Sequence, residues 1–351
     1  MFLGNQVPWF AFVVHARDLR DLLTFPGATL IREHSSSDEE FVEKLSTNPP
    51  VVLDDVRFGT AAIRGEIIGV PLLPEAIVTP DGHRAVIDAV KLAVQRGSHF
   101  VGLGALTSPA TAGGRAVVRH VPPTVTVTNG NGLTAAIAHQ NVHEARGERA
   151  PERTRVAVVG ATGSVGVPLS ELLADDGFDL VLIGSSPARA AKVLGGLAER
   201  AELAGDLGPV GEADVVVTLT NDPAAKLRPE HLRPGAVVID VAQPPNVEDS
   251  EREELARHGV SMARGGAVRI PGYSCEQDFR LPDRGQTFAC LAETYALAKE
   301  SVRETSVGRP SADYARRMAE LAGRQGIATC KLDVEVGTDP DLKTGAMSLS
   351  T

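Results

Sequence analysis

The sequence has few cysteines, and it shows neither an apolar run of membrane-spanning length nor the pattern of a signal peptide. Three of its 351 residues are cysteine, Cys275, Cys290 and Cys330, and they form neither a CxxC pair nor a zinc-type spacing. The sequence therefore predicts no metal site. No apolar stretch is long enough to cross a bilayer, and the residues after Met1 lack the basic flank and long apolar core of a signal peptide. An odd, sparse set of thiols suits a reducing cytoplasm, so we expect a cytoplasmic protein with no integral membrane segment.

The charge balance is acidic. A net charge of −10 argues against a general nucleic-acid binder, although a local basic patch can still dock a partner. Hydrophobic residues make up 43% and charged residues 23% of the chain, which is typical of a globular protein. A length of 351 residues is enough for two domains with separate cores.

The order of the predicted elements indicates an α/β fold with a central Rossmann domain. We expect an N-terminal α/β substrate domain over residues 1–150, a Rossmann domain over 151–284, and C-terminal helices with a loose tail over 285–351. The expected strands cover residues 8–14, two runs of a hairpin within 51–68, 100–106, 124–128, 156–159, 179–183, 214–219 and 236–241. The expected helices cover residues 16–23, 81–95, 133–143, 168–175, 287–302 and 312–324, and a charged linker covers 143–154.

A glycine-rich turn follows the first strand of the central domain. Val156 to Val159 form a short apolar run, and Gly160, Gly163 and Gly166 follow with the spacing of a dinucleotide-binding turn. Gly160 suits the backbone angles of the turn, Gly163 lets the backbone approach a pyrophosphate, and Gly166 lets helix and strand pack closely. The predicted cofactor-binding residues of this domain are Gly160, Thr162, Gly163, Ser164, Val165, Gly166, Ser185, Ser186, Arg189, Thr220, Gly265 and Gly266.

The end of the second strand of this domain indicates the type of nicotinamide cofactor. A carboxylate there would bind the ribose 2′-hydroxyl of NAD, but the turn from Gly184 to Arg189 contains no acid. Ser185, Ser186 and Arg189 can hold a 2′-phosphate, so we predict NADPH; the serines can also cap the next helix. No second nucleotide-binding feature favours FAD.

Cys290 is the candidate nucleophile. It lies just before or within an apolar helix, where a cysteine is either buried filler or a thiol activated by the helix start. A helix capped by Asp283 would place Cys290 two turns inside, whereas a cap at Thr287 would place it in the first turn, where the dipole activates it. Cys275 is the rival thiol.

Several short segments together resemble one enzyme family. They are Phe10-Ala-Phe-Val-Val-His15, Gly65-Glu-Ile-Ile-Gly-Val-Pro-Leu-Leu-Pro74, Gly102-Leu-Gly-Ala-Leu-Thr-Ser108, Thr128-Asn-Gly-Asn-Gly-Leu-Thr134, Gly160-Ala-Thr-Gly-Ser-Val-Gly166, Ile239-Asp-Val-Ala-Gln-Pro-Pro-Asn246, Gly265-Gly266 and Phe288-Ala-Cys-Leu-Ala-Glu293. In this order, from about residue 8 to about residue 327, the chain resembles the aldehyde-forming long-chain acyl-[acyl-carrier-protein] reductases.

This resemblance implies a reaction and a set of roles. Cys290 matches the acyl-accepting residue of the family and would take an acyl group from an acyl carrier protein or CoA thioester, after which NADPH would release it as an aldehyde. Ser108 and Asn131 would position the acyl group or complete an oxyanion hole, and the alternative for both is turn and capping duty. His15 matches a family position, although a lone histidine after an apolar strand is more often structural. Gly265 and Gly266 would let the backbone approach the nicotinamide.

The sequence is also compatible with other functions. The chain departs from the family at Gly184-Ser185, where the family usually has an arginine, and over most of its first fifty residues and its tail. A shikimate-dehydrogenase-like oxidoreductase would need no thiol. A semialdehyde dehydrogenase would need an arginine for its substrate anion, and none stands out in the sequence. A non-catalytic NADPH-binding sensor is the third alternative.

Overall fold

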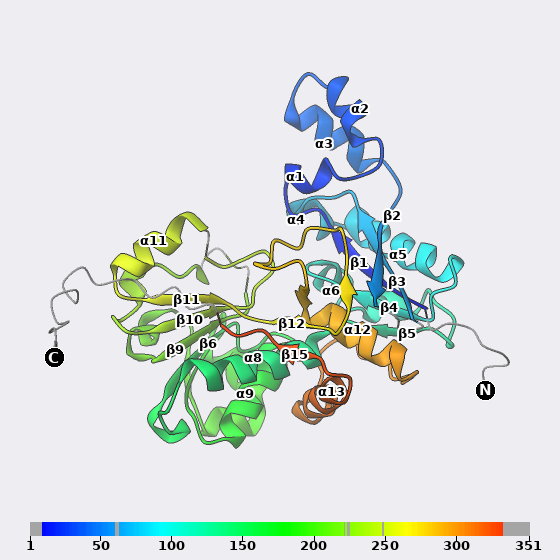
Figure 1. Ribbon diagram of the computed structural model, residues 1–351. Helices are drawn as coiled ribbons and strands as arrows, with labels where there is room; N and C mark the ends of the chain where they lie inside the picture. Colours follow the sequence, from blue (N-terminus) through cyan, green and yellow to red (C-terminus); the bar gives the residue numbers. More distant parts are fainter. Residues whose placement is uncertain (1–8, 60–62, 221, 223–224, 248, 333–351) are drawn as a thin grey trace, which may run out of the picture. The chain divides into compact units, whose positions relative to one another are not determined.

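The chain folds into two units. A computed structural model describes residues 9–59, 63–220, 222, 225–247 and 249–332 (Figure 1). Unit 1 comprises the described residues of Met1–Ile137 and Ala267–Cys330, and unit 2 those of Ala138–Gly266 and Lys331–Thr351. Across these residues no helix combines the length and apolar character that a bilayer crossing requires.

The division into units differs from the domain bounds of 150 and 284 expected from the sequence. The first boundary falls inside a helix, α8 (Asn131–Ala145), and the second falls at Gly266, two residues after the last strand of unit 2. The expected linker over 143–154 contains the last residues of α8 and a 3-10 turn, Pro151–Arg153. Residues 267–330 group with unit 1 because helix α12 (Ala289–Lys299) packs against strands of that unit.

Unit 1 is built on a six-stranded sheet with the order β13-β2-β3-β1-β4-β5. Its strands are β1 (Trp9–His15), β2 (Val51–Phe58), β3 (Arg64–Val70), β4 (Phe100–Leu103), β5 (Thr126–Thr128) and β13 (Tyr273–Ser274). The neighbours β3, β1, β4 and β5 are parallel, whereas β2 runs antiparallel to β3, which confirms the hairpin expected within residues 51–68.

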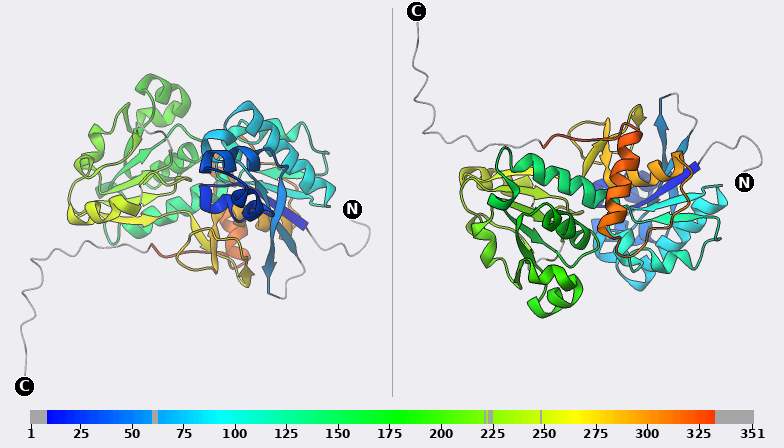
Figure 2. Two further views of the ribbon diagram at one scale, coloured as in Figure 1. Left: turned by 90° about the horizontal axis from the view of Figure 1, so that it is seen from above. Right: turned by 90° about the horizontal axis from the view of Figure 1, so that it is seen from below.

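The central strand β1 has two buried faces. Ala11 and Val13 belong to a core that includes α5 (Pro80–Gln95), whereas Phe10, on the alternate face, contacts Tyr295 of α12 with ring centroids 6.4 Å apart. Since side chains alternate along a strand, α5 and α12 cover opposite faces of this sheet, as Figure 2 shows. A strand buried on both sides explains why 8–14 reads as a continuous apolar run.

Two long helices of unit 1 begin at polar N-cap residues. Thr79 accepts a hydrogen bond from the Gly82 amide (3.2 Å) and Pro80 takes the first position of α5, which confirms the helix expected over 81–95. Helix α13 (Ala312–Arg324) starts at Ser311 and has the bounds that the sequence predicts. The remaining helices are α1 (Leu19–Leu22), α2 (Ala28–Glu33), α3 (Asp38–Ser46), α4 (Pro74–Ile77), α6 (Thr107–Ala110) and α7 (Arg115–Val118).

Unit 2 is a parallel Rossmann-type sheet with the order β11-β10-β9-β6-β7-β8. Its strands are β6 (Arg155–Val159), β7 (Asp179–Ile183), β8 (Glu202–Ala204), β9 (Val215–Thr218), β10 (Val237–Asp240) and β11 (Ser261–Arg264). Helices α9 (Gly166–Asp175), α10 (Pro187–Leu194) and α11 (Asp249–Arg257) alternate with them. The α/β class with a doubly wound parallel sheet is therefore confirmed.

A small antiparallel sheet precedes α12. Strand β12 (Ala267–Arg269) pairs with β14 (Gln286–Phe288) and with β15 (Ala328–Thr329). Thr287 pairs with Val268 and is thus part of a strand, so neither of the two caps considered from the sequence, Asp283 and Thr287, begins the helix. The N-cap of α12 is Phe288, which places Cys290 at the second helical position.

Candidate active site

The glycine turn after β6 has the backbone geometry of a nucleotide-binding turn. Gly160 has a φ of +93°, in the left-handed region, and its amide and that of Ala161 both donate to the Ile183 carbonyl at 3.0 Å. A Cβ at Gly166 would lie 2.3 Å from the Gly160 carbonyl oxygen, so only glycine lets α9 begin this close to the turn.

The residues between these glycines surround the start of α9. Gly163 is exposed, and a Cβ there would lie 3.1 Å from the Gly160 oxygen. Thr162, Ser164 and Val165 are half-buried, and Val165, at the N-cap, supplies no side-chain cap. An exposed glycine before an uncapped helix start is the geometry that accepts a pyrophosphate.

The turn after β7 combines capping with two exposed polar residues. Ser186 is the N-cap of α10 and accepts a hydrogen bond from the Arg189 amide at 3.2 Å, so the capping alternative holds for this serine. Ser185 and the side chain of Arg189 are exposed. Their positions suit the adenosine ribose of a dinucleotide bound at the glycine turn.

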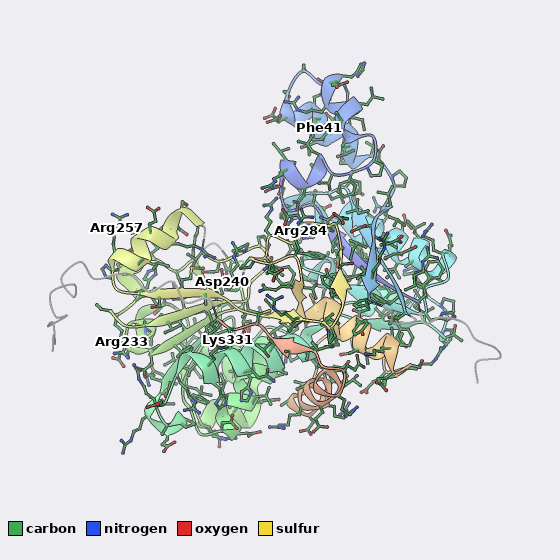
Figure 3. The ribbon with its side chains drawn as sticks, in the orientation of Figure 1. Phe41, Arg233, Asp240, Arg257, Arg284 and Lys331 are labelled. Carbon is green, nitrogen blue, oxygen red and sulfur yellow. The ribbon has the colours of Figure 1, made fainter. Side chains whose placement is uncertain are left out.

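A buried carboxylate, which was not among the site residues predicted from the sequence, organises the neighbouring loop. Asp240, at the end of β10 (Figure 3), accepts from the Thr218 hydroxyl at 2.7 Å and from the amides of Ala242, Asn246 and Val247 at 2.8–3.1 Å. Burial raises the pKa of this carboxyl. The only sequence signal for Asp240 is its place in the segment 239–246, which carries part of the family resemblance.

Asn246 extends this arrangement to the loop after β9. Its side chain accepts from the Leu227 amide and donates to the carbonyls of Thr220 and Ala225, all at 3.1 Å. Thr220 thereby lies beside the glycine turn, since a Cβ at Gly160 would meet the Thr220 Cβ at 3.2 Å. Hydrogen bonds thus join the loops after β9 and β10, and the glycine turn after β6 packs against Thr220.

Gly265 and Gly266 follow β11 at the same edge. A Cβ at Gly265 would lie 2.6 Å from the Ile239 side chain, and Gly266 has a φ of +75°. The Gly266 amide donates to the side-chain oxygen of buried Asn141 at 3.1 Å. All predicted cofactor residues of unit 2 thus lie at the carboxyl ends of its parallel strands, where α/β sheets bind nucleotides.

Cys290 lies in the first turn of α12, whose N-cap Phe288 makes no side-chain cap bond. Burial raises the pKa of its thiol to about 12, although the backbone amides of Leu291 and Cys290 itself act in the opposite direction. The helix start therefore faces the sulfur, as the Thr287 alternative required, but burial keeps the thiol protonated at neutral pH. Helix position alone could not predict that outcome.

The loop after β5 packs directly on Cys290. A Cβ at Gly130, whose φ is +69°, would lie 2.3 Å from both Cα and Cβ of Cys290. Asn131 follows and begins α8, and its amide donates to the Asn129 side chain at 3.2 Å. The structure thus places Asn131 in the loop that contacts the candidate nucleophile.

Ser108 lies in the adjoining loop after β4. It is buried in α6, and its carbonyl accepts from the Gly113 amide at 2.8 Å. The Gly113 carbonyl in turn accepts from Asn129 at 3.2 Å, which links this loop to the one that contacts Cys290. Ser108, Asn131 and Cys290 are therefore grouped in unit 1 near the carboxyl ends of β4 and β5.

Glu293, whose role was not predicted from the sequence, connects these loops to α12. The side chain is fully buried and accepts from the Thr128 hydroxyl, from the Leu133 amide at 2.7 Å and from the Tyr314 hydroxyl at 3.0 Å. Burial raises its pKa. Because Glu293 lies one turn after Cys290, it holds the β5–α8 loop at the start of α12.

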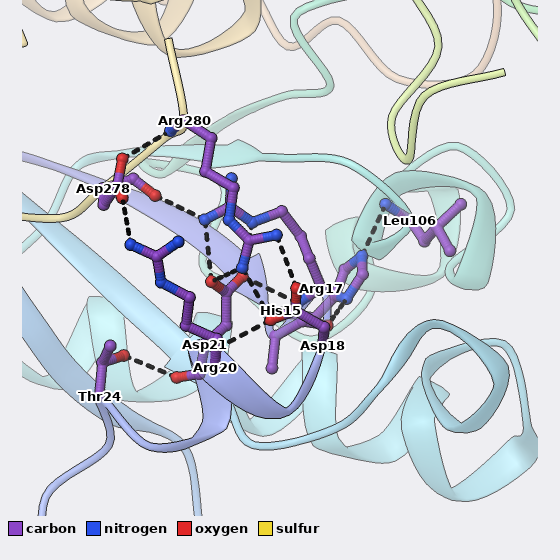
Figure 4. Close-up of polar contacts among 10 residues, drawn as sticks. His15, Arg17, Asp18, Arg20, Asp21, Thr24, Leu106, Asp278 and Arg280 are labelled. Carbon is purple, nitrogen blue, oxygen red and sulfur yellow. Dashed lines mark hydrogen bonds and ion pairs between the residues drawn. The ribbon is translucent and has the colours of Figure 1, made fainter. Parts of the chain in front are cut away.

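His15 is the last residue of β1, and backbone atoms contact both nitrogens of its ring. Nδ1 donates to the Ala16 carbonyl at 2.7 Å, and Nε2 accepts from the Leu106 amide at 3.4 Å, as Figure 4 shows. Burial lowers the pKa of the ring, which keeps it neutral. These contacts favour the structural role that the sequence left as an alternative.

A cluster of charged side chains lies beside this strand end in Figure 4. Arg280 donates to both carboxylate oxygens of Asp18 at 2.6 and 2.7 Å and to Asp21 at 2.7 Å. The guanidinium holds the pKa of Asp18 at about 2. This cluster fastens the segment between β13 and β14 to α1.

The other two thiols lie in different surroundings. Cys275 Sγ donates to the Asp54 carboxylate at 3.0 Å, and burial together with that carboxylate raises its pKa to about 12. Burial also raises the pKa of Cys330, which lies beside the small sheet. Neither cysteine is at a helix start, so Cys290 is the best placed thiol for nucleophilic chemistry.

Comparisons with known proteins identify the nucleotide-binding part of the chain. Residues 155–267 match the NAD-binding domain of semialdehyde dehydrogenases. This match and the geometry of the glycine turn agree, and the chain therefore contains an NAD(P)-binding domain of the dehydrogenase type.

One curated relative matches a larger part of the chain. The aminotransferase PigE of Serratia sp. is 31% identical over 268 residues, which cover 69% of this chain. The chain spans only 29% of the length of that relative.

The solved structures are more distant. L-tryptophan dehydrogenase from Nostoc punctiforme is 15% identical, with 89% of this chain and 87% of that chain covered and a TM-score of 0.39. A thermostable alcohol dehydrogenase from Pyrobaculum aerophilum is 22% identical, with 38% and 39% covered and a TM-score of 0.31. Because both TM-scores are below 0.5, neither likeness supports a conclusion about this chain.

Proposed function

We propose that the protein reduces an acyl thioester, carried by an acyl carrier protein or by CoA, to an aldehyde with NADPH. The observation that carries this proposal is Cys290 in the uncapped first turn of α12, with the amides of Cys290 and Leu291 beside its sulfur. It lies in a chain with a dehydrogenase-type nucleotide-binding domain. A thiol at a helix start is the group that accepts an acyl chain, and the nucleotide domain supplies the place for a reductant.

The acyl transfer is a thiol–thioester exchange. The Cys290 sulfur attacks the thioester carbonyl carbon, a new C–S bond forms, and the bond to the carrier sulfur breaks. The proton of the Cys290 thiol ends on the departing carrier thiol. Because burial holds the pKa of Cys290 at about 12, the thiolate forms only as the acyl group is bound, and the first-turn amides stabilise the developing negative charge.

The reductive half of the reaction releases the product. NADPH, when bound, supplies the hydride that the carbonyl carbon of the acyl-Cys290 thioester accepts. The bond to the Cys290 sulfur then breaks, the aldehyde leaves, and the thiolate takes up one proton from solvent. Within unit 1, Gly130 and Asn131 belong to the loop that packs against Cys290, and this loop orients the acyl group. Glu293 holds the loop in place through its hydrogen bonds.

The preference for NADPH over NADH is part of this proposal. Ser185 and Arg189 are exposed after β7, and the Ser186 hydroxyl, which accepts from the Arg189 amide, still has its own hydrogen to donate. Two hydroxyl donors and a guanidinium suit a 2′-phosphate, and the turn lacks the carboxylate that would repel it.

A semialdehyde dehydrogenase activity is the second candidate, because residues 155–267 match the nucleotide-binding domain of that family. It would use Cys290 to attack a small aldehyde substrate that carries a carboxylate group. The name of the PigE relative is consistent with aldehyde formation, since an aldehyde is a carbonyl compound that an aminotransferase converts to an amine. The two candidates differ in substrate, so substrate range separates them.

Intact-protein mass spectrometry tests the proposal. We expect incubation with acyl-CoA thioesters of several lengths, without NADPH, to add one acyl mass to the wild type and to Cys275→Ala, but not to Cys290→Ala. Addition of NADPH should then remove the adduct and release an aldehyde that a hydrazine traps. NADPH binding with no adduct from any thioester would favour the non-catalytic sensor, and turnover of only small carboxylated aldehydes would favour the second candidate.

A further inference from the structure

Three potential metal ligands converge in unit 2 at the end of α9 away from the glycine turn. His139 and His143 lie one turn apart on α8, and Asp176 is the C-cap residue of α9. Both Nε2 atoms lie 2.7 Å from the same carboxylate oxygen, Asp176 Oδ2, and 3.3 Å from each other. The side chains are between 21% and 39% exposed, so an ion from solvent can reach them.

These separations match the coordination shell of a small divalent ion. Ligand atoms about 2.1 Å from a tetrahedral zinc ion lie about 3.4 Å from one another. The 3.3 Å between the two imidazole nitrogens fits this value, and the carboxylate oxygen would have to move outward by less than about 1 Å. We propose that His139, His143 and Asp176 form a site for a divalent transition-metal ion of the zinc class.

The chemistry of the ligand set supports this class of ion. Imidazole nitrogens suit zinc, copper, iron and nickel, whereas magnesium and calcium prefer oxygen ligands only. The three ligands leave a fourth position to solvent. The ion would join α8 to the C-terminal end of α9, so we assign it a stabilising role in unit 2.

Arg146 sets a condition for binding. Its Nε donates to His143 Nδ1 at 3.2 Å, which fixes the hydrogen of that ring on Nε2, the atom that would bind the ion. A metal-bound His143 carries its hydrogen on Nδ1 and cannot accept this bond, so Arg146 has to turn away. Asp175, the residue before Asp176, pairs with Arg200 at 3.5 Å. Arg146 therefore opposes the ion by its hydrogen bond and by its charge.

A Co²⁺ titration of the chelator-treated protein, followed by visible absorption, tests this site. We expect one equivalent of Co²⁺ to produce the bands of a four-coordinate ion and Zn²⁺ to displace it. His143→Gln and Asp176→Asn should each weaken binding at least about tenfold, whereas His120→Gln, which changes an exposed histidine outside the site, should leave it unchanged.

Arg146→Met provides the test in the opposite direction. It removes the competing donor and the positive charge, so the affinity for Co²⁺ should increase and the Tm rise on saturation with Zn²⁺ should be larger than in the wild type. The proposal is overturned if the wild type binds no stoichiometric Co²⁺, if His143→Gln and Asp176→Asn bind it as the wild type does, or if Arg146→Met binds it more weakly. Circular dichroism and NADPH affinity report whether each variant is folded.

Discussion

Gly130→Ala should destabilise unit 1 and disturb Cys290 at the same time. The residue has a φ of +69°, and a Cβ there would lie 2.3 Å from both Cα and Cβ of Cys290. These two atoms are fixed by the backbone, so a rotation of the Cys290 side chain cannot relieve the clash. Left-handed backbone strain costs about 1–2 kcal/mol for a non-glycine residue, and forcing extra atoms into a packed region costs about 1–3 kcal/mol. We therefore expect a loss of about 2–5 kcal/mol in the free energy of unfolding.

Gly27→Ala is the matched control. Gly27 also lies in unit 1 and has a φ of +79°, but a Cβ there would meet no atom within 4 Å. Its substitution should therefore lower the free energy of unfolding by the backbone strain alone, about 1–2 kcal/mol. Urea unfolding followed by the fluorescence of Trp9, the only tryptophan, reports on unit 1 directly. Equal losses in the two variants, with an unchanged rate of Cys290 alkylation in Gly130→Ala, would refute the close approach of this loop to the thiol.

Three further predictions concern the thiol, the cofactor and the buried carboxylate. Alkylation of Cys290 by iodoacetamide should accelerate about tenfold per pH unit between about pH 7 and pH 10, since its pKa is raised to about 12 and the thiolate is the reactive form; a plateau below about pH 8, measured by peptide mass spectrometry, would contradict this. Arg189→Glu should weaken NADPH binding at least about tenfold and leave NADH binding unchanged in fluorescence titrations, while Arg257→Glu on α11 alters neither. Asp240→Asn should lower the free energy of unfolding in urea by about 2–4 kcal/mol, because backbone N–H groups donate to both carboxylate oxygens and the NH₂ group of asparagine would have to face one of these donors. An unchanged unfolding midpoint would show that this loop does not depend on the carboxylate.

The sequence predicted those elements whose patterns arise locally. Strands β6, β7, β9 and β10, together with α5 and α13, follow from apolar runs, helical periodicity and capping residues, and their observed bounds agree with the expected ones to within a few residues. The sequence did not predict the two outer strands of unit 2, β8 and β11. The φ of Gly160 and the tight contact at Gly166 also follow from the glycine spacing alone. These features depend on residues close together in the chain.

The start of α12 and the state of Cys290 depend on distant residues. Residues 286–288 form a strand because they pair with 267–269, and nothing in the local pattern shows this pairing. The raised pKa of Cys290 results from burial, which a helix start cannot reveal. His139 and His143 have the i, i+4 spacing of helical metal ligands and could have been found in the sequence, but Asp176 joins them only through folding.

The division of unit 1 into two chain segments has a consequence for synthesis on the ribosome. The hydrogen bond from the Leu133 amide to Glu293 joins residues 160 positions apart, and residues 138–266 of unit 2 are translated between them. At about 5–20 residues per second this interval lasts roughly 10–30 s. During this interval unit 2 can fold. The face of β1 that carries Phe10 stays uncovered, because α12, which contributes Tyr295, has not yet been synthesised. The nascent chain is therefore exposed to aggregation through the sheet of unit 1 rather than through the nucleotide-binding sheet.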